Sequence, residues 1–387
     1  MVGSERLGVA TRETMKETLM GICDVAVEEL LHRAPARVEQ QRIAERLNGQ
    51  TVLVTGAAGS IGSELCRRIG SFHPAAIVAF DIAESALFHL DLDMQRRFPN
   101  RRFHPEPGNI QNQQRIAEVM EKHRPAVVYH AAAYKHLPMM ETHVFEAVEN
   151  NVFGTWNAVE AAKAHGAAEF VLISSDKAVR PSSVMGASKR LAEMVALDSE
   201  RPGIRCIAVR FGNVLGSSGS VIPIFREQIA SGGPLTITHP EMRRYFMTVQ
   251  EAAQLVLQAS TMGCGGEVFE LDMGEPAKIV DLARRLIALA GLKPEDIRIE
   301  FTGVRPGEKI FEEPSEHTSP TRHQRIRAVE QGGRRATRIR SALDRLRIAC
   351  AHRDVAGLIR LLQEFIPDYT PSAHVLGLAE TLAPTST

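Results

Sequence analysis

Short apolar runs alternate with longer amphipathic segments along most of the chain. The runs at 51–54, 76–80, 126–129, 170–173 and 204–210 have the length and composition of buried strands in a parallel sheet. A weaker run around 102–104 predicts one more strand. Helical segments separate these runs, and the longest covers about 144–165 before Gly166 ends it. Repeated strand–helix units of this length predict an α/β fold with a doubly wound parallel sheet.

Weaker patterns predict the remaining organisation. Residues 237–248 are typical of a short strand pair, and 297–301 of a half-buried strand, because apolar and charged residues alternate there. We therefore expect five regions: a helical N-terminal arm (1–48), a Rossmann dinucleotide-binding domain (49–212), a smaller α/β substrate-binding region that partly returns to the core (213–320), a helical C-terminal extension (321–372) and a flexible tail (373–387).

The N-terminal arm carries an apolar helix face. Its apolar residues recur at steps of three and four, and they are Met15, Leu19, Ile22, Ala26 and Leu30. This face either packs on the chain's own domain or mediates self-association. We predict a homo-oligomer.

A glycine-rich turn follows the first strand. Gly56, Gly59 and Gly62 have the spacing G-x-x-G-x-x-G, and Ser60 and Ile61 lie at the start of the next helix. Glycines let the backbone approach a pyrophosphate, and the helix N-terminus offers free N–H groups. The turn therefore predicts a dinucleotide site.

Asp81 indicates which dinucleotide is bound. It ends the second strand about 20 residues beyond the glycines, where a ribose-binding carboxylate is expected, although it could instead cap the following helix. A carboxylate accepts hydrogen bonds from ribose hydroxyls but repels a 2′-phosphate. Glu84 adds negative charge, and no Arg or Lys follows until Arg96. We expect NAD rather than NADP.

The stretch 170–190 concentrates reactive side chains. Its strand ends in Ser175, Asp176 and Lys177, and the next helix carries Met185 and Lys189 on one face, four residues apart. Ligands of open α/β sheets bind beyond the carboxyl ends of the strands. A hydroxyl, a carboxylate and two amines therefore reach one pocket, unless this is a surface loop that happens to be polar.

Other strand ends carry further candidates for cofactor contact. Asn109 and Ile110 follow the third predicted strand. Ala131, Ala132 and Ala133 follow the fourth, where small residues suit either close approach of a cofactor or plain packing.

Three more residues are candidates for substrate contact. Lys135 lies just beyond the alanines at the same strand end. Asn213 begins a Gly/Ser-rich stretch that either contacts substrate or is a plain loop. Arg305, before Pro-Gly, either binds a phosphate with both arms of its guanidinium or is an ordinary surface residue.

Composition narrows the function classes. The formal net charge is zero, so no global field favours nucleic acid or a membrane surface. The five cysteines lack metal-ligand spacing and indicate a reduced, cytoplasmic protein without a metal site. No apolar run approaches the roughly 18 residues of a membrane span, and the N-terminus lacks a signal-peptide core. The basic stretch 321–360 is either a solvated helix face or an anion-binding surface.

Seven motifs in order carry a family resemblance: TGAAGSIGSEL, HAAAYKH, SSDKAVRPSSVMGASKR, RFGNVLGSSGSVIP, RRYFMT, LDMGEP and RPGEK. Together they resemble the extended short-chain dehydrogenase family, and within it the bacterial UDP-N-acetylglucosamine 4,6-dehydratases. Most short-chain dehydrogenases have Tyr at the position of Met185. Because a thioether holds no proton, another group must take the hydroxyl proton or the enzyme is inactive. Met is typical of this dehydratase branch, so the substitution favours an active dehydratase.

The resemblance implies NAD-dependent oxidation at carbon 4, elimination of water across carbons 5 and 6, and return of the hydride to carbon 6. It assigns Asp176 to acid–base work at the carbon 6 and carbon 4 hydroxyls, and Lys177 to carbon 5 as the base. Ser175 would bind the carbon 4 oxygen, and Lys189 the nicotinamide ribose. Lys177 needs a lowered pKa for this role, which burial and nearby Lys189 would give.

The remaining implied contacts are with the nucleotide. Asn213, Arg305 and Glu308 match nucleotide-binding positions of the family, and Arg244 lies in its RRYFMT motif. The resemblance also implies a UDP-sugar substrate, oligomerisation and a role in capsule, O-antigen or glycan synthesis.

Departures from the family pattern are few. Asn109 replaces the usual Asp near the adenine, and Ser175 replaces the commoner Thr. Many Met-bearing relatives carry membrane helices before the catalytic part, so the chain resembles a short soluble form or an isolated catalytic region. An NAD-dependent 4-epimerase shares fold and cofactor but needs no Asp–Lys pair. A non-catalytic NAD-binding protein would not need Asp176, Lys177 and Lys189.

Overall fold

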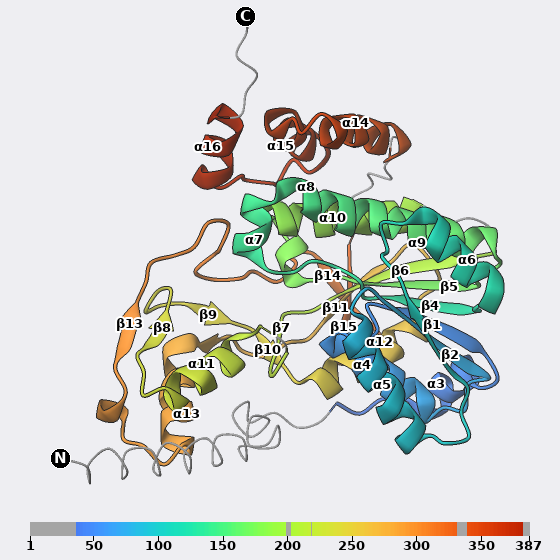
Figure 1. Ribbon diagram of the computed structural model, residues 1–387, viewed down its shortest axis with the longest axis horizontal. Helices are drawn as coiled ribbons and strands as arrows, with labels where there is room; N and C mark the ends of the chain where they lie inside the picture. Colours follow the sequence, from blue (N-terminus) through green and yellow to red (C-terminus); the bar gives the residue numbers. More distant parts are fainter. Residues whose placement is uncertain (1–35, 199–202, 218, 331–338, 382–387) are drawn as a thin grey trace, which may run out of the picture.

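A nine-stranded sheet forms the centre of the computed structural model (Figure 1), which describes residues 36–198, 203–217, 219–330 and 339–381. The strand order is β14-β15-β11-β6-β5-β4-β1-β2-β3. The strands are β1 (Thr51–Thr55), β2 (Ala76–Asp81), β3 (Phe103–Pro107), β4 (Val127–His130), β5 (Glu169–Ile173), β6 (Arg205–Arg210), β11 (Val268–Leu271), β14 (Thr318–Pro320) and β15 (Ile326–Val329).

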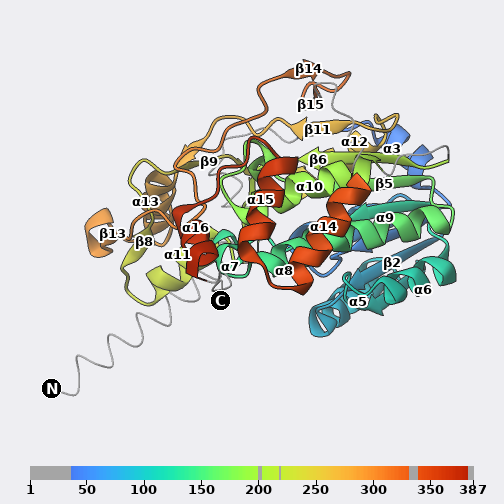
Figure 2. The ribbon, with the colours of Figure 1, turned by 90° about the horizontal axis from the view of Figure 1, so that it is seen from above.

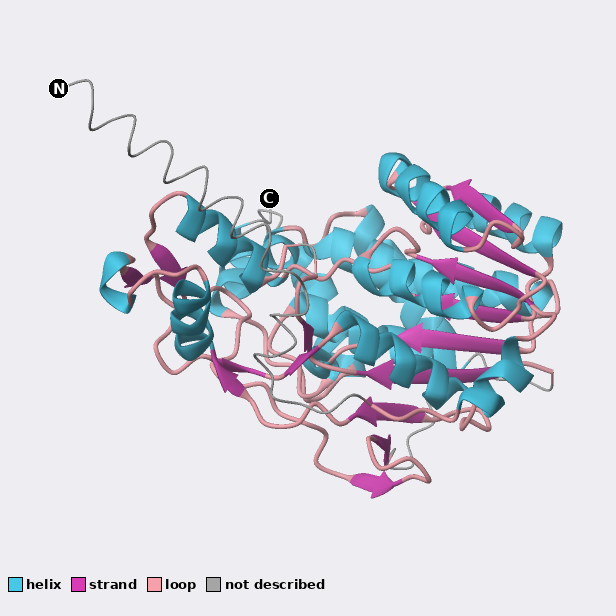
Figure 3. Ribbon diagram, turned by 90° about the horizontal axis from the view of Figure 1, so that it is seen from below, coloured by secondary structure: helices cyan, strands magenta, loops and turns pink. Residues whose placement is uncertain are grey.

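The first six strands are parallel and lie in the order 3-2-1-4-5-6, which confirms the predicted doubly wound sheet (Figure 3). Strands β1, β2 and β3 follow one another in one direction across the sheet, and β4, β5 and β6 follow in the other direction. The strand order therefore switches between β1 and β4, and open α/β sheets bind ligands in the crevice at the carboxyl ends of such a strand pair. Strand β11 adds in parallel to β6, β15 pairs antiparallel with β11, and β14 pairs antiparallel with β15 at the edge of the sheet.

The strand expected around 102–104 is present as β3, which covers Phe103–Pro107. Two prolines lie inside it, Pro105 and Pro107, and proline cannot donate to a sheet ladder. Strand β3 tolerates both because it is the last strand of the sheet and pairs only with β2.

Helices cover both faces of the sheet (Figures 1 and 3). One buried apolar cluster contains residues of α6 (Gln113–His123), α9 (Gly154–Ala164) and α10 (Val184–Asp198). The other contains residues of α3 (Gln40–Leu47), α4 (Ser60–Gly70), α5 (Glu84–Arg97) and α12 (Val249–Ser260). The long helix predicted over 144–165 comprises α8 (Val144–Val148), a π-helical turn (Glu149–Phe153) and α9.

A smaller lobe with its own apolar core lies beside the sheet (Figure 1). It contains α11 (Val221–Ala230), β8 (Leu235–Ile237), α13 (Ile279–Leu289) and β13 (Ile299–Phe301). Helix α12 and strand β11 return from it to the main sheet.

The predicted strand pair within 237–248 is wrong. Three short strands lie there, namely β8, β9 (Arg243–Arg244) and β10 (Phe246–Met247). They pair with β13, β12 (Ala277–Lys278) and β7 (Asn213–Val214). Residues distant in sequence supply each partner, which local patterning does not reveal.

The C-terminal part differs from the expectation at two places. Residues 318–329 return to the main sheet as β14 and β15 before α14 (Ile339–Ala351) and α15 (Val355–Phe365) begin. The expected flexible tail instead starts with α16 (Ala373–Thr381), in which Val375 is fully buried. The Ser372 hydroxyl, just before α16, donates to the buried carboxylate of Glu141, which anchors this segment.

Helix α14 accounts for much of the basic stretch. One face of this helix is apolar and buried, and it carries Ile339, Leu343, Leu346 and Cys350. Helices α14 and α15 lie over α8 and α10 (Figure 2). Three guanidinium groups stack on aromatic rings of the helices below, at 5.0 to 5.7 Å from the ring centroids: Arg340 on Trp156, Arg347 on Phe153 and Arg353 on Phe145.

The N-terminal arm is described only from residue 36. The predicted apolar face over Met15–Leu30 lies outside the described residues, so the homo-oligomer stays a prediction. Helix α3 buries Ile43 and Leu47 against the domain, and Arg46 pairs with Glu169 at the start of β5.

A buried ion pair joins the elements behind the central stretch. The Arg210 guanidinium, at the end of β6, donates to both carboxylate oxygens of Glu193 in α10, at 2.6 and 2.7 Å. Ser174 and Arg190 donate to the same carboxylate. Burial would raise the pKa of Glu193, but the Arg210 charge outweighs it and lowers this pKa to about 2. Arg210 also donates to Ser315.

Replacing Arg210 should therefore destabilise the fold strongly. In Arg210→Met the Glu193 charge stays buried with Arg190 as its remaining cation, and we expect a loss of roughly 3 to 5 kcal/mol in the free energy of unfolding. Urea denaturation measures this loss. Arg345→Met is the matched control, because Arg345 pairs with Glu364 at the surface, and it should leave the midpoint nearly unchanged. Equal midpoints for the two variants would contradict the prediction.

Candidate active site

The glycine-rich turn packs tightly against the end of β4. Gly56 has φ of +64°, and a Cβ there would lie 2.5 Å from the Ala132 nitrogen. A Cβ on Gly62 would lie 2.1 Å from the Gly56 oxygen. Gly59 is the N-cap of α4, which begins at Ser60 and continues through Ile61. The glycines thus bring the backbone close to the helix N-terminus, as a pyrophosphate cradle requires.

The residues predicted for the rest of the dinucleotide site follow neighbouring strands. Asp81 ends β2, and its carboxylate accepts the backbone N–H groups of Ala58 and Ala83 at 2.8 and 2.9 Å. Asn109 follows β3 and accepts from the Gln111 N–H. Ile110 is buried beside Gly154.

The alanines after β4 pack on the glycine turn. The Ala131 N–H donates to the Thr55 carbonyl, and the backbone of Ala131 and Ala132 leaves no room for a Cβ on Gly56. This close approach requires a glycine at position 56. Ala133 is next along the chain, and Lys135 lies in the exposed loop before α7 (Leu137–Thr142).

Strand β5 delivers the central group of side chains. Directly after it, Ser175 and Lys177 both donate to the same oxygen of Asp176, Oδ1, at 3.0 Å. Lys177 also donates to the Asn213 side chain, at 3.0 Å. Asn213 lies in β7, so the Gly/Ser-rich stretch begins as a strand rather than a plain loop.

The second carboxylate oxygen of Asp176 has no hydrogen-bond partner among the described residues. The side chain is 1% exposed, and Oδ2 is buried without a hydrogen bond to protein. A buried carboxylate oxygen left unsatisfied costs free energy, so such an atom at a strand end marks a place for a ligand's donor. A sugar hydroxyl has the right chemistry to donate there.

The pKa of Lys177 differs from the expected direction. Burial favours the neutral amine, but the carboxylates of Asp176 and Glu312 outweigh it and raise the pKa of Lys177. The expectation of a lowered pKa is wrong because it left out the attraction of the Asp176 and Glu312 carboxylates for the ammonium. Arg244 is a cation that opposes them.

Lys189 and Met185 line the first turns of α10. The Lys189 amine donates to the Ile173 carbonyl at the end of β5, at 2.6 Å. Burial lowers the pKa of Lys189 to about 8. Met185 is buried one turn earlier. Lys189 therefore lies at the end of the central strand, and Met185 lies one turn earlier in the same helix.

A second charged group lies next to this one. Arg244 in β9 pairs with Glu308 at 3.3 Å, and its guanidinium also donates to the carbonyls of Ile310 and Lys309. Arg305 contacts Glu308 at 3.5 Å, and its side chain is about half exposed. The RPGEK segment and β9 are thereby held together.

Glu312 joins the two groups, and sequence reasoning missed it. Its Oε1 lies 3.8 Å from the Lys177 amine and 3.9 Å from Arg244 Nε. Its side chain is 3% exposed. The sequence around Glu312 gave no local signal, because its partners Lys177 and Arg244 are 135 and 68 residues away in the chain.

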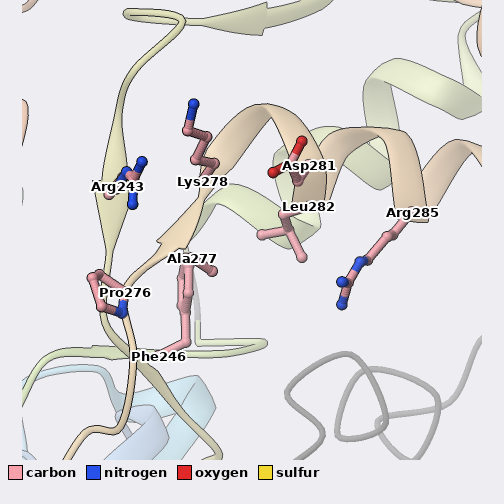
Figure 4. Close-up of a pocket in the computed structure, with 8 residues that line it drawn as sticks. All are labelled: Arg243, Phe246, Pro276, Ala277, Lys278, Asp281, Leu282 and Arg285. Atoms are coloured by element: carbon pink, nitrogen blue, oxygen red, sulfur yellow. The ribbon is translucent and has the colours of Figure 1, made fainter.

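A hollow of about 300 Å³ lies elsewhere, in the smaller lobe (Figure 4). Arg243, Lys278 and Arg285 line it together with Asp281, above the apolar side chains of Phe246 and Leu282. It contains none of the predicted site residues. Arg243 and Arg244 are neighbours in β9, and successive side chains of a strand point to opposite faces.

Two features are absent from the described part of the chain. None of the helices there has both the length and the apolar character needed to cross a membrane. No group of three or more His, Cys, Asp or Glu side chains there is close enough together to hold a metal ion.

The sheet order, the glycine turn and the Ser–Asp–Lys cluster at one edge define an extended short-chain dehydrogenase fold. The chain belongs to the polysaccharide biosynthesis protein family, whose model matches residues 52–331.

Two curated relatives are just over 50% identical to this chain in the part that matches. The capsular polysaccharide biosynthesis protein CapD of Staphylococcus aureus is 53% identical over 75% of this chain and 49% of its own length. The probable polysaccharide biosynthesis protein EpsC of Bacillus subtilis is 52% identical over 76% and 49%. The chain thus spans about half the length of these relatives. A UDP-glucose 4-epimerase of Rickettsia canadensis is 36% identical over 68% of this chain and 76% of its own.

Solved structures agree on the fold. Pen from Bacillus thuringiensis superposes with a TM-score of 0.69 at 32% identity, over 74% of this chain and 89% of Pen. DesIV, a dTDP-glucose 4,6-dehydratase from Streptomyces venezuelae solved with NAD, gives 0.57 at 22% identity, over 65% and 84%.

Proposed function

We propose that the protein is an NAD-dependent nucleotide-sugar 4,6-dehydratase that acts on UDP-N-acetylglucosamine for surface polysaccharide synthesis. The observation that carries this proposal is the buried, unpartnered Oδ2 of Asp176 beside the Lys177 amine. Elimination of water next to a ketone needs a base that removes the carbon 5 proton and an acid that protonates the leaving hydroxyl. An amine adjacent to a carboxylate can supply both groups. Membership of the polysaccharide biosynthesis family supports the pathway.

The dinucleotide site fits NAD. The cradle at Gly56 and Gly62 would hold the pyrophosphate, Asp81 the adenine ribose, and Lys189 the nicotinamide ribose. The rest of the dinucleotide site would be lined by Asn109, Ile110 and Ala131–Ala133. When bound, NAD supplies oxidation at carbon 4 and the matching reduction at carbon 6. DesIV, which has the same fold, was solved with NAD.

Ser175 and Asp176 would act first, at the carbon 4 hydroxyl. The unpartnered Oδ2 of Asp176 accepts the hydroxyl proton, while the Ser175 hydroxyl turns from Asp176 to the oxygen. Met185 only shapes the wall, because its thioether exchanges no proton. The resulting ketone acidifies the carbon 5 hydrogen.

Lys177 would then remove the carbon 5 proton as a free amine. Asp176 returns the proton it has taken to the carbon 6 hydroxyl, which leaves as water. When carbon 6 is reduced, Lys177 returns its proton to carbon 5. The protons balance over the cycle, and both side chains end as they began.

The nucleotide would lie beyond this pair, toward the smaller lobe. Arg244 and Arg305 offer two guanidinium groups for the diphosphate. Asn213 and Glu308 offer an amide and a carboxylate for the remaining nucleotide groups. Lys135 lies in the loop after β4, and we retain it as a substrate contact.

A 4-epimerase is the second candidate, because a UDP-glucose 4-epimerase is among the relatives. An epimerase oxidises and reduces the same carbon, so it needs no base at carbon 5. The pairing of Lys177 with Asp176 and the thioether at Met185 favour the dehydratase.

NMR of the product tests the function directly. Incubation with UDP-N-acetylglucosamine should give a UDP-4-keto-6-deoxy sugar, with a new methyl signal at carbon 6. The inverted or retained configuration at carbon 5 is read from the same spectrum. UDP-N-acetylgalactosamine without a methyl signal would instead indicate the epimerase. Unchanged substrate with NAD bound would indicate a non-catalytic protein.

We expect NAD to bind more tightly than NADP. The Asp81 carboxylate and nearby Glu84 would repel a 2′-phosphate. Calorimetric titration of the cofactor-free protein measures both affinities. Asp81→Asn should narrow the difference between them, and equal or tighter NADP binding in the unchanged protein would contradict the prediction.

Variants at the central stretch separate the proposed roles. Asp176→Asn and Lys177→Met should each lose about a hundredfold to ten-thousandfold in turnover, because each removes a proton-transfer group. Met185→Ala should lose only modest activity. Carbon 5 exchange with deuterated solvent, followed by NMR, should slow in Lys177→Met. Near-normal turnover in both polar variants would rule out the mechanism.

A further inference from the structure

Glu312 is a buried carboxylate for which neither sequence pattern nor family resemblance supplied a role. It follows the segment 305–308, which carries the candidate nucleotide contacts, and precedes Ser315, which bonds to Arg210 and Glu270. The surrounding bonds fix its backbone on both sides. Its side chain is 3% exposed, so its charge is compensated by protein cations rather than by water.

Two cations of the proposed site, Lys177 and Arg244, lie beside Glu312. Lys177 lies 3.8 Å and Arg244 3.9 Å from the same oxygen, Oε1. Both separations exceed a hydrogen bond, so the attraction is electrostatic and leaves each cation's donors free for other partners. Lys309 adds a weaker positive field at Glu312.

Lys177 thus faces two carboxylates, and they are not equivalent in the proposed cycle. Asp176 takes a proton when carbon 4 is oxidised, so its negative charge disappears at that stage. In the proposed cycle Glu312 touches no reacting atom and takes no proton. Burial raises the pKa of Glu312, and the nearby charges of Lys177 and Arg244 oppose this by favouring its carboxylate form. Of the groups that face Lys177, which are Asp176, Glu312 and Arg244, it is then the only remaining anion among the described residues.

We propose that Glu312 is a positioning residue that holds Lys177 beside Asp176 and sets the pH at which this amine becomes a free base. The inference rests on the proposed function, in which Lys177 removes the carbon 5 proton. Without Glu312, one cationic neighbour, Arg244, would face the amine with no compensating carboxylate once Asp176 is protonated. The ammonium form would then be disfavoured.

Glu312→Gln tests the proposal, because it keeps the shape and removes the charge. A nearby carboxylate stabilises an ammonium, so its loss should lower the pKa of Lys177, and the rising limb of turnover against pH should move to lower pH by about one pH unit or more. KM for the UDP-sugar should not rise, since the site gains positive charge. A purely structural defect would reduce turnover at every pH and leave the limb in place.

Two further variants serve as controls. Glu313→Gln changes the adjacent residue, whose carboxylate is half exposed and pairs with Arg180 and Lys309, and it should leave the limb unchanged. Glu312→Asp keeps the charge and should restore the limb toward that of the unchanged protein. Thermal melting checks that all three are folded.

A measurement without turnover keeps this inference separate from the proposed function. NMR of protein labelled with ¹³C at the lysine ε-carbon gives the pKa of Lys177, with its signal identified by its loss in Lys177→Met. A lower pKa in Glu312→Gln than in Glu313→Gln supports the role of Glu312. Equal values overturn it. If the unchanged protein gives no 4-keto-6-deoxy product, the proposed function fails, and the NMR comparison still decides the inference.

Discussion

The paired charges of Arg210 and Glu193 are the constraint on which the site depends. Both are nearly inaccessible to water, and their two-pronged contact joins the end of β6 to α10. Ser174 at the end of β5 and Ser315 beyond the RPGEK segment bond to the same pair. Burying two charges is costly unless every donor and acceptor is satisfied. The network meets that condition and fixes the ends of β5 and β6, helix α10 and the segment at Ser315 relative to one another.

The working groups lie just above this network and are also charged. Asp176, Lys177, Glu312 and Arg244 alternate in sign, so each is stabilised by its neighbours despite burial. The arrangement explains how the Lys177 side chain is held in place before substrate arrives. It also leaves one oxygen of Asp176 without a protein partner, pointing to the chemistry that the ligand must bring.

The sheet and the central stretch were predictable because their signals are local. Apolar strands followed by Gly-rich or polar turns identified β1, β2, β4, β5 and β6, and the edge of a parallel sheet collects their carboxyl ends. The pairing of β8, β9 and β10 was not predictable, since each partner comes from a distant segment. Helix α16 was missed for a similar reason, because Glu141 and the apolar core, rather than its own sequence, hold it in place.

The sequence by itself determined the doubly wound sheet, the glycine turn, the acid at the end of β2 and the set Ser175, Asp176, Lys177, Met185 and Lys189. Each of these features is a short pattern of residues close together in the chain, so the local sequence is enough to predict it. Only the tertiary structure decided the electrostatics. It placed Glu312 near Lys177 and Arg244, and the carboxylates of Asp176 and Glu312 together raise the pKa of Lys177 instead of lowering it. The physical reason is that a pKa depends on every charge within a few ångströms, whatever its distance along the chain.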